Sequence, residues 1–177
     1  MFKRSDLLNL LKGEGVSGPY LDILTHNMVK RVEIKRVTRG IYTFNDESAV
    51  VGFAFQPFYY SMENALSLRG MSEQATNFVV MTTRNARTGV RLFEDRNYRV
   101  QHINKRHFFG YGLMRYGEYW LPVSDIEKTI IDLVYLGDHV SNEAIKRSGH
   151  SIGRWKKAFR ISQGIRSKNK EKGGSAA

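Results

Sequence analysis

Apolar residues recur at helical spacing in two stretches near the start of the chain. The first runs from Ser5, a suitable N-cap, to Leu11 and ends before Gly13. The second runs from Pro19 to about Lys30, with Leu21, Leu24 and Met28 at positions i, i+3 and i+7. These patterns predict two short helices joined by a glycine-containing turn.

The pattern then changes from helical spacing to alternation. Val32 and Ile34 alternate with charged residues, Arg36–Gly40 has the composition of a turn, and Ile41–Phe44 resumes an extended apolar pattern. We expect a basic β-hairpin here. Helix, turn, helix and hairpin within 45 residues is the order of a winged helix-turn-helix, although the leading helix of that fold is missing or reduced.

The chain after residue 45 mixes strand and helix patterns. Phe78–Thr83 is an apolar run that predicts a buried strand, and Ser61–Leu68 predicts a capped helix. Ser124–Glu127 has the spacing of a capping box in front of a helix that ends near Gly137. We also expect strands over 90–93 and 99–103, an irregular aromatic-rich sheet over 106–123, and C-terminal helices over 142–147 and around 152–159. The predicted fold class is α+β, a winged helix-turn-helix followed by a mixed α+β domain.

Charge is distributed unevenly along the 177 residues. The net charge of +11 divides into +4 for residues 1–45, −2 for 46–145 and +9 for 146–177. A near-neutral middle between basic ends is typical of a protein that binds a polyanion and has a separate folded body. We therefore predict a DNA-binding winged-helix domain over 1–45, an α+β domain over 46–165 and a disordered basic tail over 166–177.

Composition excludes several classes of function. The chain is 41% hydrophobic and 25% charged, has no cysteine, and contains no apolar run of the roughly 20 residues that span a bilayer. A cytoplasmic protein without membrane contact, disulfides or cysteine-ligated zinc is expected. The histidines form no H-x-x-x-H pair, and phosphate-loop, nucleophile-elbow and dinucleotide motifs are missing. We therefore expect no metal, no cofactor and no catalytic residue.

The winged-helix interpretation identifies candidate DNA contacts. The helix over 19–30 would enter the major groove, and its candidates for base contacts are Tyr20, Thr25, His26 and Asn27. The alternative is that these side chains simply face solvent. The expected phosphate or minor-groove contacts are Lys30, Arg31, Lys35, Arg36 and Arg39. Near the C-terminus, a second phosphate-binding surface or a solvated helix face is predicted at Arg147, Arg154, Lys156, Lys157 and Arg160.

An enzymatic alternative rests on Glu33-Ile34-Lys35. Glu-x-Lys on a strand is half of a metal-dependent nuclease site, in which carboxylates hold Mg²⁺ and the lysine steadies the attacking water or the transition state. Such a site needs a further acid upstream. Asp22 lies on a predicted helix, so hairpin charge is the better explanation, and a small nuclease is the second hypothesis.

Three segments together resemble the AbiEi family of antitoxins and transcriptional regulators of type IV toxin–antitoxin systems. They are the hairpin that closes on Arg39–Tyr42, the helix start Ser61–Leu66, and the segment Val123–Asp132, in the family's order over residues 5 to 140 approximately. The resemblance implies an abortive-infection, phage-defence antitoxin that binds inverted repeats in its own promoter as a repressor. It also implies a second domain that neutralises a nucleotidyltransferase-like toxin, directly or indirectly. The N-terminal unit is shorter than is usual for the family.

Overall fold

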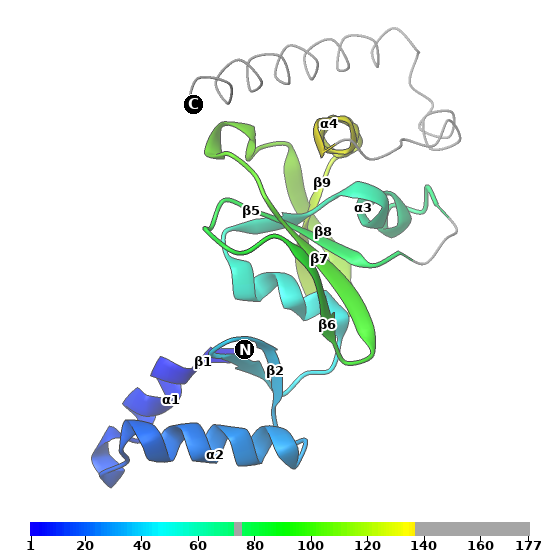
Figure 1. Cartoon of the computed structure of the whole chain (residues 1–177). Helices are drawn as coiled ribbons and strands as arrows, with labels where there is room; N and C mark the ends of the chain where they lie inside the picture. The colour runs from blue at the N-terminus through cyan, green and yellow to red at the C-terminus, as the bar shows by residue number, and fades with distance from the viewer. Residues whose placement is uncertain (73–75, 137–177) are drawn as a thin grey trace, which may run out of the picture.

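The computed structural model describes residues 1–72 and 76–136, which form a small N-terminal unit and a larger unit (Figure 1). We call residues 1–45 the head and residues 46–136 the body. Both contain helices and a sheet, so the predicted α+β class is confirmed. The predicted C-terminal helices, basic tail and second basic surface (Arg147, Arg154, Lys156, Lys157 and Arg160) lie outside the described residues.

The head has the predicted order of helix, turn, helix and hairpin, with a two-residue strand in front. Its elements are β1 (Phe2–Lys3), α1 (Arg4–Leu10), the 3-10 helix η1 (Lys12–Glu14), α2 (Gly18–Lys30), β2 (Lys35–Thr38) and β3 (Ile41–Thr43). The Ser17 hydroxyl accepts a hydrogen bond from the Tyr20 amide at 3.4 Å, which caps α2 at its predicted start. The three strands form an antiparallel sheet in the order β1-β3-β2.

The described head is not a complete winged helix, which corrects that part of the prediction. Its first strand has two residues, and α1 has seven, none of them buried. A winged helix packs several helices around a core of its own, whereas α1 buries too little apolar surface to take part in such a core. The head therefore retains the second helix and the hairpin of that fold without its full set of packed helices.

The hairpin starts later than predicted. Val32 is 69% exposed with φ +60°, and its amide donates to the Val29 carbonyl in the turn that follows α2. The alternation over Val32–Ile34 therefore does not form a strand. Residues 36–38, expected in the turn, belong to β2, and the chain reverses at Arg39–Gly40, where Gly40 has a φ of +74° that favours glycine.

The body is built on a six-stranded sheet in the order β6-β7-β5-β4-β9-β8. β4 pairs antiparallel with β5 and parallel with β9, and β5 pairs parallel with β7. Its elements are the 3-10 helix η2 (Ser48–Phe55), β4 (Phe58–Tyr60), α3 (Met62–Leu68), β5 (Phe78–Thr82), β6 (Gly89–Phe93), β7 (Arg96–His102), the 3-10 helix η3 (Lys105–His107), β8 (Tyr111–Tyr116), β9 (Tyr119–Ser124) and α4 (Ile126–Leu136).

Helices cover both faces of this sheet, so its central strands are buried on both sides. Figure 1 shows α3 and α4 on one face and η2 on the other. Tyr60, Phe78 and Val80 pack in a cluster with η2, while Tyr59 and Val79 pack in a second cluster with α3 and α4. The alternation follows from the two-residue period of a strand, and burial on both faces explains why β5 is apolar from Phe78 to Met81.

The head is attached to the body through a shared core. Val37 and Ile41 of the hairpin belong to the same buried cluster as η2 and the central strands. The Tyr98 hydroxyl donates to the Val37 carbonyl at 2.8 Å, and Arg91 Nη1 donates to Thr38 Oγ1 at 3.0 Å. The hairpin side of the head therefore faces the body, and in Figure 1 the small sheet lies between α2 and the body.

Within residues 1–72 and 76–136, none of the helices combines the length and apolar character that a membrane-spanning segment requires.

Candidate functional site

The outer face of α2 carries a stripe of exposed side chains. Tyr20 is 54% exposed and Ile23 59% exposed, and Asn27 and Lys30 are exposed at the following positions i+7 and i+10. These spacings place the four residues on one side of the helix, and the exposed His26 flanks them. The opposite side packs on the head through Leu21, which is fully buried. The stripe is therefore free of any role in the core of the head.

Thr25 does not belong to this exposed surface, which corrects its prediction as a base-contacting residue. Its side chain is buried, and its hydroxyl donates to the backbone carbonyls of Leu21 at 2.9 Å and Asp22 at 3.1 Å. These hydrogen bonds to the helix backbone satisfy the hydroxyl group of the buried threonine. Ile23 takes the place of Thr25 in the stripe, and sequence analysis missed it because an exposed isoleucine is not expected on a helix face.

Lys35 is also unavailable for the phosphate contact that was predicted for it. Its ammonium lies 3.0 Å from Glu94 and 3.6 Å from Asp46, and its side chain is only 15% exposed. The hydrogen bond that the Lys35 ammonium donates to Glu94 raises the pKa of Lys35 above its ordinary value, so the ammonium stays charged and paired. Lys35 therefore joins the head to the body.

The predicted DNA contacts fall into two groups on different sides of the head. Lys30 is the last residue of α2 and Arg31 is its C-cap, so both lie at the end of the outer face. The Arg31 guanidinium also lies 3.9 Å from the Glu33 carboxylate. Arg36 and Arg39 are exposed on the hairpin, which faces the body. The outer face of α2 and the hairpin turn are therefore separate candidate surfaces, and a single DNA-binding wing beside α2 is not what the described head presents.

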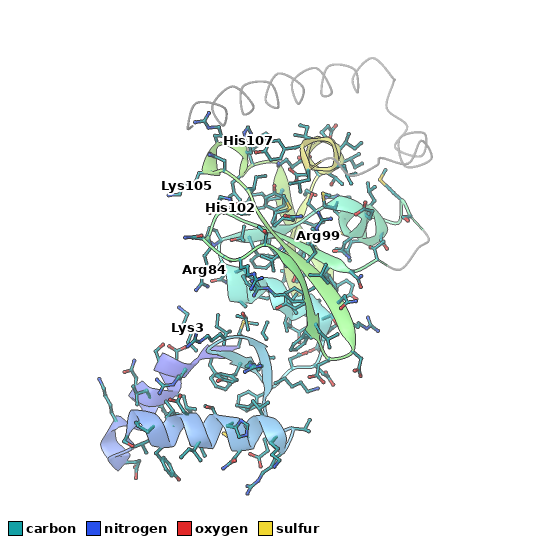
Figure 2. The ribbon with its side chains drawn as sticks, viewed as in Figure 1. Lys3, Arg84, Arg99, His102, Lys105 and His107 are labelled. Carbon is teal, nitrogen blue, oxygen red and sulfur yellow. The ribbon has the colours of Figure 1, made fainter. Side chains whose placement is uncertain are left out.

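A basic cleft lies where the hairpin meets the body. It has a volume of about 410 Å³, and its lining includes six cationic side chains and, in this described region, no carboxylate; the six are Lys3, Arg4, Arg39, Arg84, Arg87 and Arg91. Figure 2 labels Lys3 on the head and Arg84 on the body. Sequence analysis named no candidate over residues 84–91 and so missed their part in this site, because the other cations of the cleft lie more than 40 residues earlier in the chain.

Two of the cleft arginines are held in place by hydrogen bonds. Arg84 Nη1 donates to the Ala54 carbonyl at 2.8 Å. Arg91 donates to Thr38 Oγ1 and, at 2.7 Å, to the Arg87 carbonyl, and its guanidinium lies 5.0 Å from the centre of the Phe55 ring. A guanidinium has five N–H donors, so each arginine keeps donors for a ligand. Their positions are set before any ligand binds.

A buried polar cluster occupies the contact between β4, β9 and α4. The Lys128 ammonium forms an ion pair with Asp132 one helical turn away, and each side chain is only 1% exposed. The other oxygen of Asp132 accepts hydrogen bonds from the Tyr59 hydroxyl at 3.0 Å and the Ser61 hydroxyl at 2.8 Å. Burial raises the pKa of Asp132, and Lys128 opposes that shift by favouring the carboxylate.

The same cluster explains the segment Val123–Asp132 that resembles a family motif. The Ser124 hydroxyl turns inward to Ser61 at 3.1 Å and Thr129 at 2.6 Å, while Asp125 accepts from the Lys128 amide at 2.7 Å. Asp125 therefore caps α4, which corrects the predicted cap at Ser124. Because the charged members are shielded from solvent, we assign the cluster to stability and not to catalysis.

The structure places only Lys35 of the predicted nuclease half-site Glu33-Ile34-Lys35 on a strand. Lys35 is held by Glu94 and Asp46, and Glu33 lies in the segment before β2 begins. Among these residues no three His, Asp or Glu side chains gather where they could hold a metal ion. Burial, together with Lys128, lowers the pKa of His107, and the histidines at 139 and 150 lie outside the described residues.

Comparisons with known proteins match this chain to no family model and to no curated protein. The relation to AbiEi antitoxins therefore stays a prediction from the motifs.

Proposed function

We propose that this protein binds double-stranded DNA through the outer face of α2 and acts as the antitoxin and self-repressor of a toxin–antitoxin operon. The observation that carries the DNA-binding part is the exposed stripe formed by Tyr20, Ile23, Asn27 and Lys30. It lies on α2, which is separated from the body by the small sheet (Figure 1). The 13 residues of α2 form a helix of a size that the major groove admits.

Each side chain of the stripe has a chemical role in this proposal. Asn27 is suited to paired hydrogen bonds with adenine, and Ile23 to apolar contact with a thymine methyl group. Lys30 and Arg31, at the end of α2, supply phosphate contacts. Because the hairpin faces the body, α2 would dock without a wing beside it, as a single recognition helix in the major groove.

The antitoxin part rests on the resemblance to the AbiEi family. Its motif at Val123–Asp132 is explained by the buried cluster of the body, so the motif supports a common fold more directly than a common partner. Co-expression with a nucleotidyltransferase-like toxin from the same operon tests this part. Restored growth supports it, and growth that remains arrested in the presence of folded protein contradicts it.

DNA binding is tested by fluorescence anisotropy with the protein's own promoter and with random DNA of equal length. Asn27→Ala should weaken promoter binding about 5- to 150-fold and barely change binding to random DNA. Lys30→Ala should weaken both and reduce the slope of log affinity against log salt by about one unit. The matched controls, Asn97→Ala and Lys105→Ala, remove the same groups from exposed positions on the body.

Two outcomes would contradict the interface. Equal effects of Asn27→Ala and Asn97→Ala would show that α2 does not read bases, and an unchanged salt slope in Lys30→Ala would remove that lysine from the interface. Mg²⁺-dependent cleavage of supercoiled plasmid that is lost in Glu33→Gln would identify the nuclease instead.

A further inference from the structure

The basic cleft adjoins a second hollow between head and body. This second hollow has a volume of about 720 Å³ and shares Lys3, Ile41, Ala54 and Arg84 with the basic cleft. Both volumes lie in the range of about 300–1,000 Å³ that is usual for small-molecule sites. We call the two together the junction cleft, with a basic half and a mixed half.

Most cations of the basic half have no carboxylate partner among the described residues. Arg4 forms an ion pair with Asp22 at 2.5 Å, but in the part of the chain that the structure describes no ion pair involves Lys3, Arg39 or Arg87. Cations that line one cleft repel one another, and an anion bound between them would relieve that repulsion. Guanidinium groups bind phosphate oxygens in pairs, which makes a phosphate chain the chemical complement of this half.

The mixed half offers aromatic rings and side-chain amides. Phe2, Phe53 and Tyr119 line it together with Asn45, Gln56 and one carboxylate, Asp6, which accepts a hydrogen bond from the Lys3 amide at 2.8 Å. Aromatic faces stack on a flat heterocycle, and amides supply donors and acceptors to its edge. Asn45 is already hydrogen-bonded to the Tyr119 hydroxyl, which fixes two of these groups relative to each other. A heterocyclic base fits this half.

The location of the cleft favours a small ligand over a DNA duplex. The cleft opens between the small sheet and the body, whereas the outer face of α2 lies on the other side of that sheet (Figure 1). A duplex held by α2 therefore does not require the cleft, and the cations there need another partner.

We propose that the junction cleft binds a nucleoside oligophosphate, with the phosphates in the basic half and the base in the mixed half. The ligand would touch head and body at once, through Lys3 and Arg39 on one side and Arg84 and Arg87 on the other. This site is distinct from the DNA-binding face proposed above and does not depend on it.

The test is calorimetric titration of the full chain with ATP, GTP and inorganic tripolyphosphate at constant ionic strength. The nucleotides should bind with saturation at one site, and tripolyphosphate should bind at least fivefold more weakly because it lacks the base. In Arg39→Gln/Arg87→Gln, nucleotide affinity should fall by more than tenfold, since each lost charge-assisted hydrogen bond is worth about tenfold in affinity. Both side chains are exposed, so the variant should fold, which circular dichroism checks.

The control variant Lys105→Gln/Arg106→Gln removes the same charge from exposed positions outside the cleft and should change affinity less than twofold. The proposal is overturned by absence of saturable nucleotide binding, by equal losses in the two double variants, or by tripolyphosphate binding as tightly as ATP. Cleft-dependent binding of single-stranded DNA without nucleotide binding would also overturn it. Asn27→Ala should keep nucleotide binding, so failure of this proposal and failure of promoter recognition give different results.

Discussion

The head and the body differ in how they use their buried residues. The body holds a two-sided aromatic core and a buried ion pair, whereas the head buries few side chains, and two of them, Val37 and Ile41, pack into the body's cluster. A unit of about 45 residues buries too small a fraction of its surface to be stable by itself. The head therefore depends on the body for stability. Because the contacts with the body are made by the hairpin, the outer face of α2 stays free for binding.

This difference bears on the predicted boundary at residue 45. A cut there would separate Val37 and Ile41 from the cluster that they share with Tyr98 and would leave that apolar surface exposed. The change of net charge near residue 45 separates a basic segment from a near-neutral one. It does not mark the limit of a hydrophobic core, because charged side chains lie mostly on the surface.

The largest effect is expected inside the body, at Lys128→Met. Removing the ammonium leaves the Asp132 carboxylate buried and unpaired, which should lower the free energy of unfolding by about 3–5 kcal/mol. Urea unfolding followed by circular dichroism measures this. Lys128→Met/Asp132→Asn removes both charges and should be less destabilised than the single variant. A double variant as unstable as the single would show that the ion pair is not the cause.

The same variant should show a characteristic pH dependence. Without Lys128, the pKa of Asp132 should rise further in the folded state, since only the hydrogen bonds from Ser61 and Tyr59 then oppose the effect of burial. A raised carboxyl pKa favours folding below the unfolded pKa of about 3.9, and this contribution is lost as the pH rises through the folded pKa. The penalty of Lys128→Met should therefore be smaller at mildly acidic than at alkaline pH, whereas the exposed control Lys105→Met should show no such trend.

The next effect is expected at Ile41→Ala, in the shared core. Loss of a buried isoleucine should cost about 2–5 kcal/mol, and because the residue joins head to body the whole protein should still unfold in one transition. Circular dichroism and hydrogen exchange of the body's amides report this. Two separate transitions would mean that the head folds independently. Ile23→Ala, on the exposed face of α2, is the matched control and should have little effect.

Local patterns predicted most of the secondary structure. Apolar spacing placed α1, α2, α3 and α4 within a few residues, and the continuous apolar run placed β5. The predicted serine caps were wrong in detail, because Ser5 lies inside α1, the Ser61 hydroxyl bonds Asp132, and Asp125 caps α4. No element was predicted over the apolar run Ala49–Phe55, which forms most of the 3-10 helix η2, because a segment buried nearly all round has no periodicity from which its conformation can be read. Val32 was misassigned because alternation alone does not reveal a left-handed turn.

The sites were harder to predict than the elements. Tyr20, His26, Asn27 and Lys30 are exposed on α2 as expected, since helical periodicity separates inner from outer positions. The cleft depends on residues 3–4, 39 and 84–91 meeting in space, and the buried cluster joins residues 59–61 to 124–132. Pairings between distant segments are decided by topology, and no local pattern in a single sequence encodes them.

A smaller effect is expected at Tyr98→Phe, which removes one hydroxyl between body and head. The Val37 carbonyl loses its hydrogen bond from that hydroxyl in a buried setting, so the free energy of unfolding should fall by about 1–3 kcal/mol. Urea unfolding gives the value. Tyr20→Phe removes a hydroxyl from the exposed face of α2 and should change stability far less; equal changes in the two variants would contradict the coupling of head and body through Tyr98.

The smallest change in stability is expected at Asn27→Ala. An exposed substitution away from the core should alter the free energy of unfolding by less than about 0.5 kcal/mol, and alanine is the better helix former. Thermal unfolding measures it alongside promoter binding. A marked loss of stability would mean that the outer face of α2 supports the fold and is not free for recognition.

The central position of β4 has a consequence for the nascent chain. β4 can pair with β5 soon after synthesis of residue 82, but its other edge, where Tyr60 pairs with Val123, stays open until β9 has been made. At ribosomal rates of about 5–20 residues per second, that interval lasts roughly 2 to 8 s. An unpaired apolar strand edge invites association with other chains. The growing polypeptide, more than the finished protein, is therefore the form in which aggregation should begin.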